Sequence, residues 1–275
     1  MKEETIQGAG GKIHLRSWPA AGKARAVVVF SHGFNSHSGQ YIWAAEQFAA
    51  GGFAVYVADL RGRGKSEGER FWVTKVGDYV DDVALAVKTA KAREPGLPVF
   101  MLGHSAGGVI ACSYALENQD QLAGLICESF AFRVPAPELA LNLVQWLGEN
   151  VAPRLGALKL KNEDFSRDPA MVATLNSDPL TKDETQPART VAALWAADKH
   201  LKVSFPKITL PVLIIHGSLD KATVPSGSQF FFDTAGSKDK TLKIYEGHFH
   251  DLLADTGKEG VMADIKAWIE KRLPG

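Results

Sequence analysis

Short runs of consecutive apolar residues alternate, through the first half of the chain, with longer segments whose apolar residues recur at helical spacing. Such runs are typical of strands buried on both faces, and the periodic segments are typical of helices packed on a sheet. Their alternation predicts an α/β fold with a mostly parallel sheet and helices on both faces. The predicted strands cover residues 25–30, 53–58, 99–102, 122–127, 212–215 and 242–245, and the predicted helices cover 42–50, 79–92 and 261–273.

Residues 130–207 interrupt this alternation. An apolar helical pattern at 138–147 is followed by polar, loop-rich sequence and then by a second helical pattern at 189–201. This part of the chain has no convincing strand pattern. We therefore predict a single α/β core formed by residues 1–129 and 208–275, with a mostly helical cap, residues 130–207, inserted into it.

Composition and charge narrow the function classes. The chain has 31 basic and 31 acidic residues, so no strong overall field attracts nucleic acid, and we expect no nucleic-acid partner. Its two cysteines, Cys112 and Cys127, lie in apolar runs and are too few for a disulfide scaffold, which predicts two buried thiols in a reducing compartment. We find no apolar signal region and no run of about 18 apolar residues, so we expect a cytoplasmic protein without a transmembrane segment.

Two segments match the G-x-S-x-G pattern, in which a serine nucleophile sits on a sharp strand-to-helix turn. The match at 103–107 centres on Ser105, and a predicted strand enters it and a helical pattern leaves it. The match at 64–68 centres on Ser66 and lies in a charged loop without these flanking elements. The flanking elements therefore predict Ser105 as the nucleophile and a structural role for Ser66.

A serine nucleophile needs a histidine base that is oriented by a carboxylate, and on this type of fold both follow the serine in the chain. Asp220 comes directly after the predicted strand 212–215, and Glu128 is the reserve candidate for the acid. Two histidines, His248 and His250, follow the last strand, and His250 is the predicted base. An H-x-H pair also suits a metal, but no further Cys/His-rich segment supports one, so we expect no metal.

The oxyanion that forms during acyl transfer needs two backbone N–H donors. Ala106, the residue after the nucleophile, is predicted to supply one of them. Phe34 is predicted to supply the other, because Gly33 after the strand 25–30 lets the chain turn its amide toward the site.

Taken together, these motifs resemble the α/β-hydrolases, and among them the bacterial monoacylglycerol lipase and lysophospholipase group, also called serine aminopeptidase-like hydrolases. The resemblance spans nearly the whole chain and implies Ser105, Asp220 and His250 as the triad, with no cofactor. The chain departs from the family pattern after the His-Gly pair, where it has Phe34, Asn35 and Ser36 and the family commonly has small residues. The matching segments are 32–33, 37–41, 59–68, 103–105, 177–180, 216–217 with Asp220 and Pro225, and Gly247 with His250.

The function expected from these residues is a serine carboxylic ester hydrolase that cleaves single-chain, lipid-like small-molecule esters through an acyl-enzyme, with transient contact between the cap and a membrane surface. The alternatives are an aminopeptidase or amidase on the same scaffold and a catalytically silent binding protein. Apolar cap residues either line an acyl pocket or pack the interior of the cap. The predicted substrate-binding residues are Glu128, Phe130, Trp146, Asp178 and Trp195; Glu128 would bind a glycerol hydroxyl or a substrate cation, or only pair with Arg133.

Overall fold

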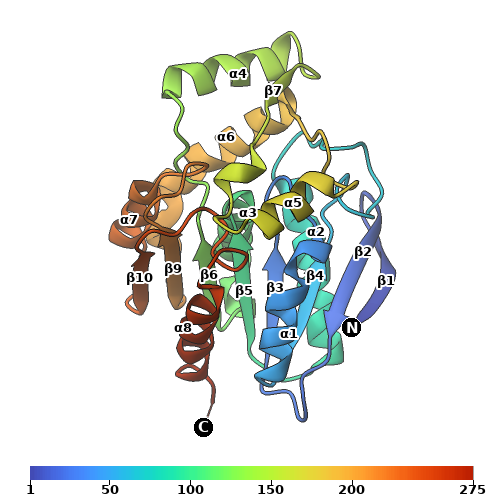
Figure 1. Ribbon diagram of the computed structural model, residues 1–275, viewed down its shortest axis with the longest axis vertical. Coiled ribbons are helices and arrows are strands. Elements are labelled where there is room, and N and C mark those ends of the chain that lie inside the picture. The colour runs from blue at the N-terminus through green and yellow to red at the C-terminus, as the bar shows by residue number, and fades with distance from the viewer. Residues whose placement is uncertain (275) are drawn as a thin grey trace.

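The computed structural model describes residues 1–274, and their main feature is an eight-stranded sheet of order β1-β2-β4-β3-β5-β6-β9-β10 (Figure 1). The pairs β1–β2 and β2–β4 are antiparallel, and all other neighbours are parallel. The mostly parallel sheet predicted from the sequence is confirmed. The strands are β1 (Lys2–Gly8), β2 (Gly11–Trp18), β3 (Ala26–Ser31), β4 (Phe53–Ala58), β5 (Val99–His104), β6 (Gly124–Glu128), β9 (Val212–Gly217) and β10 (Lys240–Tyr245).

Helices cover both faces of this sheet, as Figure 1 shows. In β3, Val27 and Val29 belong to one buried apolar cluster and Val28 and Phe30 to another, because successive strand residues point to opposite faces. Helices α1 and α8 contribute to the second cluster, and α2, α3 and α7 to the first. Their bounds are α1 (Ile42–Ala50), α2 (Gly77–Arg93), α3 (Ala106–Asn118), α7 (Pro225–Thr234) and α8 (Lys258–Glu270), and short 3-10 turns are η1 (Ser38–Tyr41), η2 (Gln119–Gln121), η3 (Asn162–Asp164) and η4 (Phe205–Lys207).

The hairpin β1–β2 was not predicted as a pair of strands. Its turn places Gly8 opposite Gly11, and β2 then joins the sheet through β4. The edge strand β1 begins with Lys2, Glu3 and Glu4, and its residues are exposed or half-buried. A strand that buries so little apolar surface leaves no hydrophobic run in the sequence.

The chain between β6 and β9 lies over the carboxyl ends of the parallel strands, at the top of Figure 1. Helices α4 and α6 match the two helical patterns of the sequence and pack on each other. The segment also holds a small β7–β8 pair and helix α5, which were not predicted. Strands of three and two residues carry no periodic signal, and α5 lies in sequence that was expected to form polar loops. Its elements are α4 (Glu138–Asn150), β7 (Gly156–Leu158), α5 (Pro169–Ser177), β8 (Gln186–Pro187) and α6 (Ala188–Ser204).

A buried ion pair joins the core to this segment. Arg63, on the loop after β4, is 1% exposed and pairs with Glu184, and it donates a 2.7 Å hydrogen bond to the side-chain oxygen of Gln186. Burial alone would lower the pKa of Arg63, but Tyr79 and Glu184 more than offset it and raise the pKa. Within residues 1–274, no helix is long and apolar enough to span a lipid bilayer.

Candidate active site

Ser105 occupies a strained turn between β5 and α3, at the carboxyl end of the sheet. Its backbone has φ 55° and ψ −123°, a conformation that residues other than glycine rarely adopt. Close packing requires small neighbours here, since a side chain on Gly107 would overlap the carbonyl group of Ser31. The strand, turn and helix expected around Ser105 are all present, and strain of this kind is characteristic of functional residues.

The structure brings Asp220 and His250 together from the loops after β9 and β10. The Nδ1 atom of His250 lies 2.7 Å from the Oδ2 atom of Asp220, so that this nitrogen donates to the carboxylate and Nε2 is the nitrogen without a proton in the neutral ring. The other Asp220 oxygen accepts from the backbone amides of Ala222 and Thr223, at 2.8 and 2.9 Å. These bonds fix the orientation of the carboxylate.

A second histidine, His216, also contacts Asp220, with its Nε2 atom 3.0 Å from Oδ2. Burial opposes the negative charge of Asp220, but attraction to His250 and hydrogen bonds from His216 and His250 hold the pKa of Asp220 well below its usual range. Asp220 therefore remains ionised across the physiological pH range. His248, the competing candidate for the base, instead lies 3.8 Å from Asp255 and makes no comparable pair with Asp220.

The loop after β3 lies directly against the nucleophile turn. A Cβ atom on Gly33 would come within 2.9 Å of the Cβ atom of Ser105 and 3.5 Å of the Ala106 nitrogen, so only glycine fits. The next residues are held by both members of the buried ion pair, because the Asn35 amide donates to Glu184 of the cap at 3.0 Å and the guanidinium of Arg63, from the core, stacks 4.4 Å from the Phe34 ring. This places Phe34 and Ala106 on adjoining segments beside Ser105, as an oxyanion hole requires.

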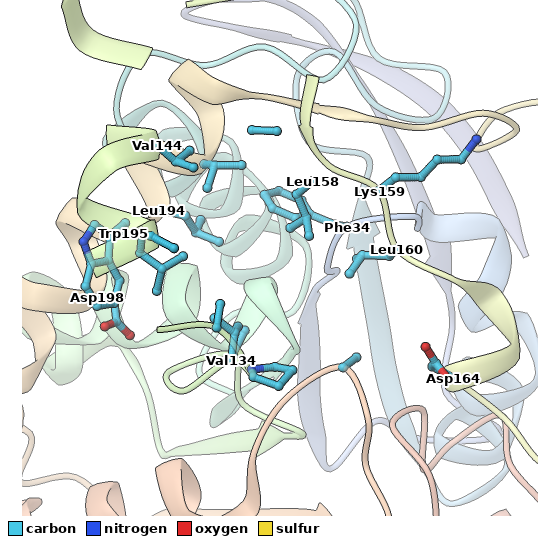
Figure 2. A pocket seen from close by; sticks show the side chains of 18 of the residues that line it. Phe34, Val134, Val144, Leu158, Lys159, Leu160, Asp164, Leu194, Trp195 and Asp198 are labelled. Carbon is cyan, nitrogen blue, oxygen red and sulfur yellow. The ribbon is translucent and has the colours of Figure 1, made fainter. Parts of the chain in front are cut away.

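A cavity of about 460 Å³ adjoins these residues, between the core and α4, β7 and α6 (Figure 2). Phe34 and Ala222 line it, and so does Phe165, whose ring packs 5.1 Å from the ring of His250. Apolar side chains make up most of the remaining wall: Val134, Leu141, Val144, Leu158, Leu160, Val191, Leu194 and Trp195. An apolar cavity with few polar groups suits a hydrocarbon chain.

Of the five residues predicted to bind substrate, Trp195 alone lines the cavity. Phe130 is fully buried and packs on Phe231, so it belongs to the core. Trp146 points outward from α4 and is 55% exposed. Asp178 is paired with His37 at 2.7 Å. Sequence periodicity identified these positions as apolar or polar but could not assign them to a particular face of the cap.

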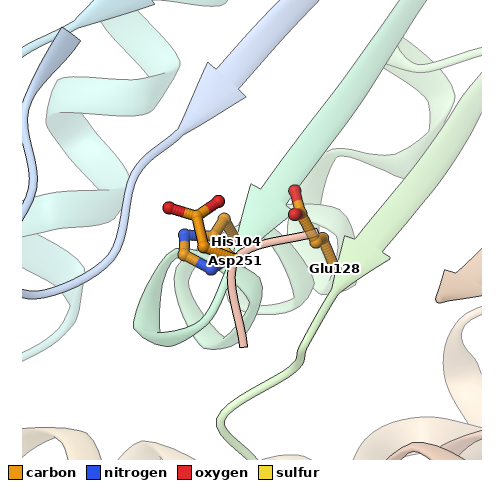
Figure 3. A group of neighbouring side chains, drawn as sticks. All are labelled: His104, Glu128 and Asp251. Atoms are coloured by element: carbon orange, nitrogen blue, oxygen red, sulfur yellow. The ribbon is translucent and has the colours of Figure 1, made fainter. Parts of the chain in front are cut away.

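The remaining predicted residue, Glu128, faces neither the cavity nor Arg133. It is fully buried beneath the nucleophile turn, beside His104 and Asp251 (Figure 3), and the three side chains bring ligand-type atoms within 4.8 Å of one another. Its Oε1 atom accepts from the Leu253 amide at 3.0 Å. Burial raises the pKa of Glu128 well above its usual range and that of Asp251 to about 6, so both carboxyl groups hold a proton more readily than exposed acids do.

This cluster supports the catalytic histidine candidate and was missed by the sequence reasoning. Glu128 anchors the segment that follows His250, and the His104 ring lies 4.9 Å from the His250 ring. The Nδ1 atom of His104 is in turn bonded to the Tyr41 hydroxyl at 3.0 Å. The available signal was that Asp251 adjoins His250 and that His104 adjoins Ser105 in sequence.

Ser66, in the second G-x-S-x-G match, has a structural environment. Its hydroxyl donates to the Asp59 carbonyl at 2.6 Å and accepts from the His14 amide at 2.8 Å. Within residues 1–274, no histidine side chain forms a hydrogen bond with this hydroxyl. The two thiols, Cys112 and Cys127, are free and buried, as predicted.

Comparison with known proteins gives the family. The family model described as "Serine aminopeptidase, S33" matches residues 22–257, and the chain belongs to this family of α/β-hydrolases. It is 30% identical to a monoacylglycerol lipase of Mycolicibacterium smegmatis over 98% of both chains, and 33% identical to the monoglyceride lipase of Homo sapiens over 97% of this chain and 89% of that one. The crystal structure of Paleococcus ferrophilus monoacylglycerol lipase superposes with a TM-score of 0.83 at 27% identity, covering 94% of this chain and 99% of that one. The protein is thus an enzyme, a hydrolase.

Proposed function

We propose that this hydrolase cleaves single-chain carboxylic esters, monoacylglycerols or similar small alkyl and aryl esters, through an acyl-enzyme formed on Ser105. The observation that carries the proposal is the 2.7 Å pair of His250 and Asp220 beside a strained serine turn and an apolar cavity. The relatives that are named monoacylglycerol lipases support the same substrate class.

In the proposed mechanism, the Ser105 hydroxyl attacks the ester carbonyl carbon while its proton passes to the Nε2 atom of His250. Asp220 stabilises the imidazolium that results, and the Phe34 and Ala106 amides donate hydrogen bonds to the carbonyl oxygen as it becomes an oxyanion. Collapse of this intermediate breaks the bond to the alcohol, which leaves with the proton from His250. A water molecule, activated by the same histidine, then hydrolyses the acyl-enzyme and restores Ser105.

The first prediction concerns pH. Because His250 must be neutral to accept a proton and Asp220 stays ionised, log kcat/KM is expected to rise with pH along a single limb of slope one. Asp251 is next to His250 in the chain and burial raises the pKa of Asp251 to about 6, so Asp251→Asn is the control for this limb and should leave it in place. Initial rates from pH 4 to 9 measure this dependence of log kcat/KM on pH. A slope of two, or the loss of the rising limb in Asp251→Asn, would assign the ionisation to a group other than His250.

The second prediction concerns chain length. Each further methylene that enters the cavity should contribute up to about 0.8 kcal/mol to transition-state binding, so kcat/KM rises with acyl length and breaks when the cavity is full. Val144→Phe narrows the lining and should move the break to a shorter chain, whereas Trp146→Ala, on the same helix but outside the cavity, should not.

Rates on a series of p-nitrophenyl esters from C2 to C16 test this directly. A single chain fits the cavity and three do not, so triolein should be a far poorer substrate than monoolein. A flat length profile, or equal rates on triolein and monoolein, would contradict an acyl site for a single chain in this cavity.

The cap offers a surface for transient membrane contact, which we include in the proposal. Leu139, Leu143 and Trp146 recur at helical spacing along α4 and are 82%, 56% and 55% exposed. Apolar residues in such a row favour the interfacial region of a bilayer. We expect the double variant Leu143→Glu/Trp146→Glu to lose sedimentation with phosphatidylcholine vesicles while keeping its rate on soluble esters. Unchanged sedimentation would eliminate this surface.

The alternative is an aminopeptidase or amidase, which the family's description favours. Turnover of aminoacyl p-nitroanilides faster than of the matching esters would replace the ester proposal with this one. We also propose a cytoplasmic location, supported by the two free, buried thiols, which cell fractionation would test.

A further inference from the structure

Asp198 is an ionisable residue in the wall of an otherwise apolar part of the cavity. It projects from α6 beside Trp195, and its side chain is 6% exposed. Figure 2 places it on the opposite side of the cavity from Asp164, which precedes Phe165, the residue that packs on the His250 ring. Asp198 is therefore at the end of the cavity remote from the reacting atoms.

The Asp198 carboxyl has no structural partner that would explain its burial. Its Oδ1 atom is buried without a hydrogen bond to any group within residues 1–274. The cations that surround it are bonded elsewhere: Lys202 to Glu138 at 3.5 Å, Lys199 to Gln145 at 2.6 Å and Arg133 to Ser226 at 3.0 Å. The Trp195 N–H is likewise taken, by Asn142 at 2.8 Å.

An unpartnered carboxyl in an apolar wall destabilises the fold relative to an aliphatic side chain of similar size. Burial raises the pKa of Asp198 to about 8, so the group holds its proton at neutral pH and is then both a donor and an acceptor. A group with both capacities at the end of a hydrocarbon-lined cavity is complementary to a neutral polar group on a bound chain. A bound cation is disfavoured, because Lys199, Lys202 and Arg133 already surround the site.

We propose that Asp198 forms a subsite for a hydroxyl group at the far end of the substrate's acyl chain, so that the enzyme selects ω-hydroxyacyl esters over plain alkanoyl esters of matching length. This inference rests on the proposed ester hydrolysis. The carboxyl would donate to and accept from the hydroxyl, satisfying the atom that is otherwise unpaired. A methyl terminus would instead leave Asp198 desolvated and without a partner.

The test compares kcat/KM for p-nitrophenyl alkanoates with that for ω-hydroxyalkanoates from C4 to C12. At the length that spans the cavity, wild type is expected to prefer the hydroxy ester, and Asp198→Leu is expected to shift the ratio of the two toward the alkanoate by roughly tenfold or more. Asp198→Asn keeps a donor and an acceptor and should retain the preference. Val203→Ala, on the same helix but 75% exposed and outside the cavity lining, is the matched control and should leave the ratio unchanged.

The melting temperatures of the variants are measured at pH 8 beside the kinetics. The melting temperature of Asp198→Asn should be no lower than that of wild type, because the substitution removes an unpaired buried acid. If Asp198→Leu fails to fold, Asp198→Ala takes its place in the kinetic comparison. Equal ratios in wild type and Asp198→Leu, or a stronger preference for ω-amino than for ω-hydroxy esters, would overturn the subsite. Under either of these outcomes the enzyme still cleaves the esters. Failure of the proposed function gives a different result, because folded wild type would then cleave neither the alkanoates nor the ω-hydroxyalkanoates.

Discussion

Ser105→Ala, Asp220→Asn and His250→Ala are each expected to lower kcat by roughly 10⁴-fold or more on any ester that the enzyme turns over. The three side chains act as a unit, so a double variant should lose little more than the worst single variant. Asp220→Asn keeps the size of the side chain but favours the wrong histidine tautomer, because an amide N–H cannot accept from the Nδ1 atom of His250. Steady-state rates on a short p-nitrophenyl ester measure all three.

The chain carries its own control for this experiment. Ser66 lies in the second G-x-S-x-G match, and its hydroxyl donates to the backbone carbonyl of Asp59 and accepts from the backbone amide of His14, so it has no side-chain base. Ser66→Ala should lower the free energy of unfolding by about 1 kcal/mol and leave kcat within a few fold of wild type. Full activity in His250→Ala, or loss of activity in Ser66→Ala without unfolding, would contradict the assignment.

The second large effect is expected at Arg63, which links the core to the cap. Arg63→Met leaves Glu184 buried without its ion partner, and we expect a loss of about 3–5 kcal/mol in the free energy of unfolding. Activity should fall as well, because Glu184 also holds the Asn35 amide beside the oxyanion segment. Urea denaturation measures the stability, and kcat of the folded fraction measures the second effect.

Two comparisons isolate the buried pair. Arg63→Met combined with Glu184→Gln removes the unpaired charge and should recover part of the lost stability. Arg154→Met breaks an exposed pair with Glu69 and should change stability by less than about 1 kcal/mol. Equal effects of Arg63→Met and Arg154→Met would mean that the buried pair contributes no more to stability than an exposed one.

Sequence reasoning performed best where local pattern and local structure coincide. The buried parallel strands left continuous apolar runs, and the strand, turn and helix around Ser105 are contiguous in the chain. Asp220 and His250 could be proposed as partners because loops at the carboxyl ends of parallel strands meet at one edge of a sheet. Their 2.7 Å contact depends on the fold and not on any spacing in the sequence.

The parts that escaped prediction involve contacts between distant segments. Arg63 and Glu184 are 121 positions apart, and nothing around either residue indicates that both are buried. Glu128 was expected near substrate or near Arg133, but it faces Asp251, which comes from the far end of the chain. Asp198 lay within a helical pattern, and only the packing of α6 on α4 turns it into the cavity. Helical periodicity defines a face but not what covers it.

The central claim is that Ser105 is a nucleophile activated by His250, and labelling with a fluorophosphonate tests it most directly. The probe reacts with a serine only when a base has activated the hydroxyl. Peptide mass spectrometry of the treated wild-type enzyme should find one adduct, on Ser105, and His250→Ala should abolish it while remaining folded. An adduct on Ser66, or no adduct on folded wild type, would contradict the account.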